Sequence, residues 1–147
     1  MNGNALAHFR LRQSSWYMAG VNFGIGIAMV VNPGMLTDNP GASIYFAHLV
    51  EWVSPAAWRN LFLFIGIARL GALYVNGTFR SIWWTPHVRL AASCLSFLIW
   101  VQFATSLIMS GIVSIGTVLY SMTAMIELFN IAVAATETRG HVRDEIG

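Results

Sequence analysis

One arginine lies within an apolar stretch that is long enough to cross a lipid bilayer. The stretch runs from Pro55 to Val75, and Arg69 lies in its last third. Roughly 20 helical residues cross the hydrocarbon core of a bilayer. A charge at that depth costs roughly 2.5–3.5 kcal/mol on insertion scales, and more when it is isolated in lipid. The stretch therefore predicts a membrane span whose arginine needs a partner elsewhere in the chain.

The composition excludes a soluble globular protein. Charged residues make up 10% of the chain and hydrophobic residues 56%, with a mean hydropathy of +0.63. A soluble domain carries about 25% charged residues, so this chain has too few to cover a solvated surface. The net charge of +2 comes with scattered arginines, and we therefore expect no nucleic-acid partner. The single cysteine, Cys94, excludes an internal disulfide and is interpreted as a small buried hydrophobe.

Four apolar runs are long enough to cross a bilayer. The expected spans are residues 14–31, 55–75, 86–109 and 115–135. A serine or threonine followed by proline precedes the second and third spans, at Ser54-Pro55 and Thr85-Pro86, which is a typical helix start. Asn76-Gly77 predicts a turn after the second span. The fold class is thus an all-α integral membrane protein, with residues 1–147 forming a single membrane domain.

A fifth apolar segment, residues 42–53, is too short to span. Tyr45, Leu49 and Trp52 fall on one helical stripe, with His48 and Glu51 beside it. We interpret the segment as a short interfacial helix after the first span. A segment that folds back between the spans is the alternative.

The arginines predict the orientation of the chain in the membrane. They lie in the N-terminal arm, in the second loop and in the C-terminal tail, whereas the first loop has acidic residues before Arg59 and the third loop has no charge. The positive-inside rule then places both termini in the cytoplasm, so the topology is N-in and C-in.

Glu127 is the expected partner of Arg69, because it is the only acidic residue within another expected span. The second and fourth spans run in the same direction, and the depths of the two residues differ by about 3 Å at 1.5 Å per residue. An arginine fork can donate two bonds to a carboxylate. We therefore predict a buried Arg69–Glu127 ion pair. Arg89 is the alternative partner, but it lies nearer the cytoplasmic interface, where its side chain can extend to water.

A polar stripe follows one face of the fourth span. It comprises Tyr120, Thr123, Glu127 and Asn130, spaced three and four residues apart. Asn22 in the first span and Gln102 in the third add further polar groups, and we expect interhelical hydrogen bonds among them. A polar pathway for ions, protons or a solute is the alternative interpretation.

The first span contains Gly20 and Gly24 four residues apart, among other small residues. This small-xxx-small pattern permits the close approach of a second helix. It predicts that the first span packs tightly against protein.

Catalytic patterns are sparse. The four histidines, His8, His48, His87 and His141, lie at or outside the expected membrane edges, which disfavours a haem held by two histidines. His48 and Glu51 could share a metal, but no second such pair accompanies them. The chain has no glycine-rich phosphate loop, no Cys-x-x-Cys motif and no Ser-His-Asp candidate set. We therefore expect no cofactor, no metal and no enzymatic activity.

One run of residues resembles a known group of proteins. It begins with Arg69-Leu70-Gly71-Ala72-Leu73 and continues through Asn76-Gly77, Arg80, Pro86, Arg89, Trp100-Val101-Gln102, Ser110-Gly111, Ser114, Gly116, Tyr120 and Glu127. This pattern, over roughly residues 55–137, resembles small multi-span membrane proteins encoded by tailed phages and prophages. The resemblance implies a bacterial inner membrane or a phage context. It brings no known activity and no catalytic residue.

These features favour a non-enzymatic integral membrane subunit. Its partners would be the lipid bilayer and either further copies of itself, in a homo-oligomer, or other membrane proteins, for which it would be a structural or scaffold component. A holin-like or channel-like oligomeric pore is the first alternative. A small transporter, or an enzyme acting at the lipid interface, is the second.

Overall fold

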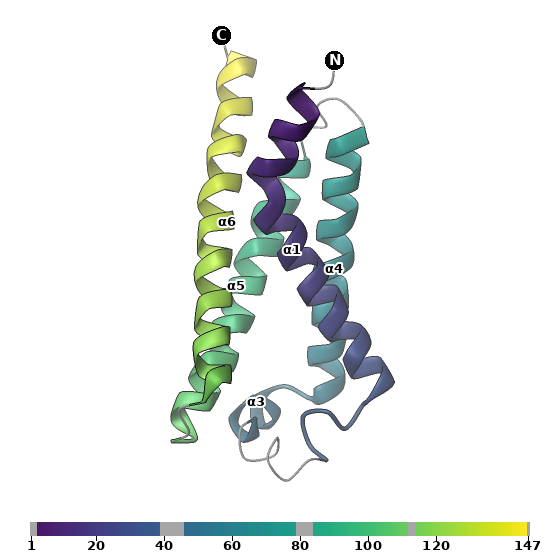
Figure 1. Cartoon of the computed structure of the whole chain (residues 1–147), viewed down its shortest axis with the longest axis vertical. Helices are drawn as coiled ribbons and strands as arrows, with labels where there is room; N and C mark the ends of the chain where they lie inside the picture. The colour runs from purple at the N-terminus through teal and green to yellow at the C-terminus, as the bar shows by residue number, and fades with distance from the viewer. Residues whose placement is uncertain (1–2, 39–45, 79–83, 112–113, 147) are drawn as a thin grey trace.

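The computed structural model describes residues 3–38, 46–78, 84–111 and 114–146, and this part of the chain is helical, without strands (Figure 1). The helices are, in chain order, α1 (Gly3–Val31), α3 (Ala47–Trp52), α4 (Pro55–Thr78), α5 (Thr85–Met109) and α6 (Ile115–Ile146). Four of them contain stretches long and apolar enough to cross a membrane: Gln13–Val31, Pro55–Val75, Thr85–Met109 and Ile115–Thr138. The all-helical fold and its four span-length helices are therefore confirmed.

Three helices extend beyond the limits that hydropathy predicts. α1 includes most of the expected N-terminal arm, and α6 continues through the charged tail to Ile146. α4 continues to Thr78, so the turn predicted at Asn76-Gly77 is wrong. Extending an existing helix adds a hydrogen bond at little nucleation cost, and one glycine near a helix end opposes this by only about 1 kcal/mol. A change to polar composition thus does not mark the end of a helix in this chain.

The two predicted serine or threonine caps have different outcomes. At the start of α4, the backbone N–H of Ala57 donates to Ser54 Oγ over 3.3 Å, as expected of a capping serine. At the start of α5, however, Thr85 is the first helical residue and is buried, and the capping position falls on Trp84, which makes no side-chain cap. Pro86 still occupies the first turn, where its missing N–H costs nothing.

The spans pack mainly as two pairs. α1 lies against α4 and α5 against α6, and contacts between α4 and α5 join the pairs. The start of α1 and the end of α6 lie at the same end of the bundle (Figure 1). We call this the terminal end and the opposite one the α3 end, because α3 packs there against α5.

The described part of the predicted interfacial segment is a single short helix. α3 covers residues 47–52, and the start of the predicted range lies outside the described residues. Leu49 is buried in the core, whereas Trp52 is 84% exposed. The two residues therefore face different surroundings, and α3 is anchored to the bundle through Leu49.

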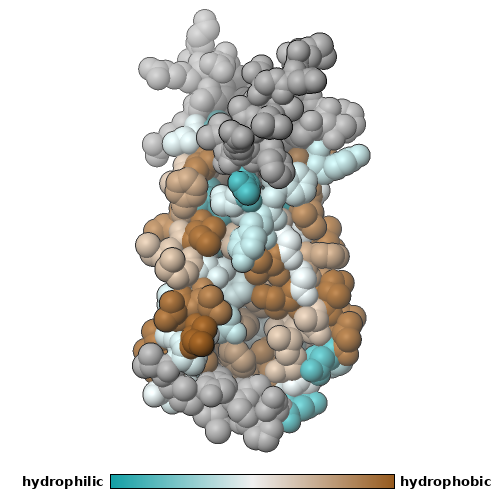
Figure 2. Space-filling model, viewed as in Figure 1, coloured by the Kyte–Doolittle hydropathy of each residue, from teal (hydrophilic) through white to brown (hydrophobic). Residues whose placement is uncertain are grey.

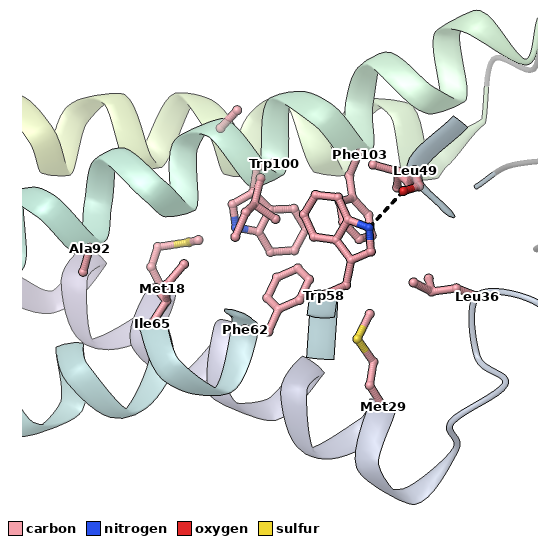
Figure 3. Close-up of a cluster of buried hydrophobic side chains, with 12 residues drawn as sticks. Met18, Met29, Leu36, Leu49, Trp58, Phe62, Ile65, Ala92, Trp100 and Phe103 are labelled. Carbon is pink, nitrogen blue, oxygen red and sulfur yellow. Dashed lines mark hydrogen bonds between the residues drawn. The ribbon is translucent and has the colours of Figure 1, made fainter. Parts of the chain in front are cut away.

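Aromatic side chains fill the interior toward the α3 end. Neighbouring ring centroids are 5.4–6.5 Å apart, with several edge-to-face pairs. This aromatic cluster consists of Phe46, Trp58, Phe62, Trp100, Phe103 and Tyr120. Trp58 also donates from Nε1 to the carbonyl oxygen of Leu49 over 3.1 Å, which ties α4 to α3 (Figure 3). Such rings contribute large apolar area and preferred geometries to a core.

Apolar side chains dominate the outside of the bundle between its ends. Figure 2 shows hydrophobic residues spread over the middle of one face. α6 is the least covered span, and large side chains along it are exposed, among them Val118, Leu119, Met122, Met125 and Phe129. So many exposed large apolar side chains are unfavourable in water and suit hydrocarbon.

The close contact between α1 and α4 is made at Gly26 and Gly66, and not at Gly20 and Gly24. A Cβ added at Gly66 would lie 2.6 Å from the backbone nitrogen of Phe23, and one at Gly26 would lie 2.9 Å from that of Leu63. Gly20 and Gly24, in contrast, have nothing within 4 Å of an added Cβ and are exposed. Within one chain, the tight packing predicted at Gly20 and Gly24 therefore occurs at Gly26 and Gly66 instead.

We predict that Gly66→Ala lowers the free energy of unfolding by about 1–3 kcal/mol, the usual cost of overpacking. The reason is that the new methyl group meets the backbone of Phe23, which cannot move without shifting α1. Gly71→Ala on the same helix is the matched control, since nothing lies within 4 Å of its added Cβ. Reversible unfolding in mixed detergent micelles measures both. Equal stability of the two variants would contradict the close α1–α4 contact.

Candidate functional site: a buried polar network

Arg69 and Glu127 meet in the middle of the bundle. Arg69 projects from α4 and donates from Nη1 to Oε1 of Glu127 on α6. The side chains are 1% and 0% exposed, respectively, so water at the surface solvates neither. A buried charge in an apolar medium persists when an opposite charge with good geometry compensates it. The pair therefore fastens the α1–α4 half of the bundle to the α5–α6 half.

Asn130 extends this contact toward α1. Its Nδ2 donates to Glu127 Oε2 over 3.2 Å. Its Oδ1 accepts from Ser14 Oγ at 2.6 Å and from Ser15 Oγ at 3.2 Å. One amide thus joins the carboxylate on α6 to two hydroxyl groups on α1, and both Glu127 oxygens have partners.

A second arginine–glutamate pair lies nearer the terminal end. Arg89 of α5 donates from Nη1 to Glu137 Oε2 over 2.5 Å, and from Nη2 to Ser15 Oγ over 3.5 Å. Arg89 is only 2% exposed, so the expectation that it extends to water is wrong. Its partner Glu137 is 26% exposed and lies within the helical continuation of α6. Because Ser15 contacts both Arg89 and Asn130, the two ion pairs belong to one connected system.

We call this system the polar network and define it by its members: Ser14, Ser15, Arg69, Arg89, Glu127, Asn130 and Glu137. It takes side chains from all four spans. Its two arginines and two glutamates balance in charge. It extends from the partly exposed Glu137 to the fully buried Arg69. Because its charges cancel and its members come from all four spans, the network can hold the helices together without a bound ion.

A sequence signal for the second pair exists in the spacing of α6. Glu137 follows Asn130 by seven residues, which is two helical turns and the same helix face. The prediction missed Glu137 because it placed the end of the fourth span at residue 135. An expectation that followed the helix further would have placed both glutamates on the inner side.

The other predicted polar residues do not all join the network. Asn22 is buried and donates to Ser96 Oγ over 2.8 Å, which links α1 to α5. Thr123 bonds the Leu119 carbonyl of its own helix over 2.7 Å. Tyr120 packs in the aromatic cluster, and Gln102 is exposed near the α3 end. Of the predicted stripe, Glu127 and Asn130 therefore join the polar network, whereas Tyr120 and Thr123 do not.

A concavity of about 380 Å³ lies at the α3 end, remote from the polar network. It is lined by His48, Leu49, Trp52, Val53, Trp58 and Gln102. His48 Nδ1 and Glu51 lie 3.8 Å apart on α3, and both are exposed. Among the described residues, no group of three or more His, Cys, Asp or Glu side chains could hold a metal ion.

Comparisons of this chain with protein-family models, with curated proteins and with solved structures find no match.

We predict that Glu127→Gln lowers the free energy of unfolding by about 3–5 kcal/mol, because it leaves the charge of Arg69 buried without a counter-charge. The matched control is Glu137→Gln, which should cost less because Glu137 is 26% exposed. The double variant Arg69→Met with Glu127→Leu should recover much of the loss, since it removes both charges together. Unfolding in mixed micelles measures these variants, and the single variants Arg69→Met and Glu127→Leu complete a double-mutant cycle with the double variant. A Glu127→Gln variant no less stable than Glu137→Gln would contradict the central role of the Arg69 pair.

Proposed function

We propose that the protein is a non-enzymatic integral membrane subunit, which assembles with further copies of itself or with partner membrane proteins as a structural component. The observation that carries this proposal is that the two buried arginines of the spans form ion pairs with glutamates of the same chain. Arg69, Arg89, Glu127 and Glu137 pair with one another and leave an apolar exterior. Chemistry on a solute or on lipid would instead need charged or nucleophilic groups that are open to it.

The placement of the polar stripe of α6 supports this function over an oligomeric pore. In a pore lined by the stripe, its residues would face water. Here Glu127 and Asn130 are buried within a single chain and bonded to α4 and α1. Tyr120 packs among aromatic rings. The aromatic cluster also fills the interior between the network and the α3 end.

We predict that a cysteine in the stripe resists a charged, membrane-impermeant thiol reagent. The variant is Thr123→Cys in a Cys94→Ser background, reconstituted in liposomes. His48→Cys in the same background is the reactive control, because the His48 side chain is 46% exposed at the α3 end. Mass spectrometry after labelling measures both rates. Labelling of Thr123→Cys as fast as the control, together with ion flux through the liposomes, would replace the subunit proposal with the pore.

The exposed face of α1 offers a surface for assembly. Gly20 and Gly24 are open, and exposed glycines four residues apart let another helix approach closely. Because this face is free within the chain, a second copy or a partner helix can use it without disturbing the bundle. The proposal places the subunit in a bacterial inner membrane, in a phage context and with both termini in the cytoplasm. The arginine distribution and the sequence resemblance support this setting.

We predict that Gly20→Leu combined with Gly24→Leu reduces the mass of the complex extracted in native nanodiscs. Leucines would fill the open space and hold a second helix away, while the fold of the single chain should persist. Gly71→Leu is the matched control, since it also adds a leucine at an open position of a span. Native mass spectrometry of the extracted complex gives the number of copies of the chain and the mass of any partner protein. A monomeric wild-type protein would contradict the assembly proposal, and an unchanged complex in the double variant would exclude this face.

A further inference from the structure

Three polar atoms in the middle of the bundle have no hydrogen-bond partner among the described residues. They are Asn22 Oδ1, Arg69 Nη2 and Trp100 Nε1. All three residues are at most 2% exposed, so bulk solvent does not reach them. An unpartnered buried polar group is unfavourable, and most such groups in native proteins bind another protein group or an ordered water. The identity of a shared partner follows from where the three atoms lie and what each can donate or accept.

The packing of α1 on α4 brings Asn22 and Arg69 to nearly the same level. Phe23 lies directly against Gly66, and the two helices run antiparallel (Figure 1). Asn22 is therefore level with Ile67, about 3 Å along the helix axis from Arg69. Helical side chains lean toward the start of their own helix, and α4 starts at the α3 end. The Arg69 guanidinium is thus directed toward the level of Asn22.

The packing of α1 on α5 adds Trp100 to this level. Asn22 bonds Ser96 over 2.8 Å, and Trp100 follows Ser96 by one helical turn. α5 starts at the terminal end, so the Trp100 side chain leans back toward Ser96. Figure 3 shows its indole nitrogen on the edge of the ring nearer Met18, which lies one turn from Asn22 on α1. Asn22, Arg69 and Trp100 therefore lie at nearly the same level of the bundle, on α1, α4 and α5.

The chemistry of the three atoms matches one neutral guest. Arg69 Nη2 and Trp100 Nε1 are donors, and Asn22 Oδ1 is an acceptor. The charge of Arg69 is already balanced by Glu127, so no ion is required. A guest that accepts twice and donates at least once has the hydrogen-bonding pattern of water, which makes about three bonds when buried. The neighbouring α5 residues on this face, Ser93 and Ser96, are small and buried.

We propose that Asn22, Arg69 and Trp100 form a site for an internal water molecule at the inner end of the polar network. The water accepts from Arg69 and Trp100 and donates to Asn22. It continues the hydrogen-bonded chain from Glu137, through Arg89, Ser15, Asn130, Glu127 and Arg69, to the edge of the aromatic cluster. The buried arginine is thereby held by a carboxylate on one side and by water on the other. The site is independent of whether the protein assembles with partners.

Solid-state NMR of the ¹⁵N-labelled protein in liposomes tests the site through transfer of magnetisation from water. The Trp58 indole is an internal control, because it is buried like Trp100 but donates to the Leu49 carbonyl. The single variants Trp58→Phe and Trp100→Phe identify the indole N–H signals of these two residues. We expect the Trp100 Nε1–H and the Arg69 Nη protons to receive water magnetisation at short mixing times, several-fold faster than Trp58. Transfer to Trp100 or to Arg69 that is no faster than to Trp58 would overturn the proposal.

A variant then tests whether the three groups share one water. Asn22→Leu removes the acceptor and fills the space, so the fast transfer to Trp100 should be lost. Trp100→Phe keeps an aromatic ring but removes the indole N–H donor. The fast transfer to Arg69 should then persist, because Asn22 still accepts a hydrogen bond from the water. Fast transfer to Trp100 that survives in a folded Asn22→Leu protein would overturn the shared site. If Asn22→Leu does not fold, the wild-type comparison of Trp100, Arg69 and Trp58 still decides the proposal.

Discussion

Arg69 carries a charge into the apolar middle of the bundle, and the arrangement of the four spans depends on how that charge is compensated. Its partner Glu127 is held in turn by Asn130, which accepts from two serines of α1. Rotating α6 or sliding it by one residue would break several of these bonds together. Lipid hydrocarbon offers no hydrogen bonds to replace them. The ion pair therefore favours one register and one rotation of the helices, in addition to stabilising the bundle.

The interior has two parts with different physical roles. Toward the terminal end, charge-assisted hydrogen bonds connect all four spans. Toward the α3 end, aromatic rings pack edge to face. Directional bonds select one arrangement of the helices, whereas ring packing supplies contact area over a surface. The division also leaves large apolar side chains on the outside of the bundle, which suits helices that are long and apolar enough to cross a membrane.

Arg89 illustrates where inference from hydropathy stops. Its position near the start of an apolar run suggests a side chain that reaches water, yet it is buried against Glu137 and Ser15. Glu137 itself lies in what composition describes as a charged tail. Hydropathy reports where lipid ends, but the helix and its inner face continue beyond that point. Gly20 and Gly24 show the converse, since a pattern that permits close packing is left open while Gly26 and Gly66 make the contact.

The number of spans, their approximate limits and the pairing of Arg69 with a carboxylate on α6 follow from local sequence, because the length of an apolar run and the depth of a charge are properties of single helices. The remainder of the polar network depends on tertiary structure. Whether Ser15 meets Asn130, or Asn22 meets Ser96, is decided by the rotation and offset of one helix against another. Helical periodicity determines which residues of one helix share a face, but it contains no information about which face of a neighbour they will meet.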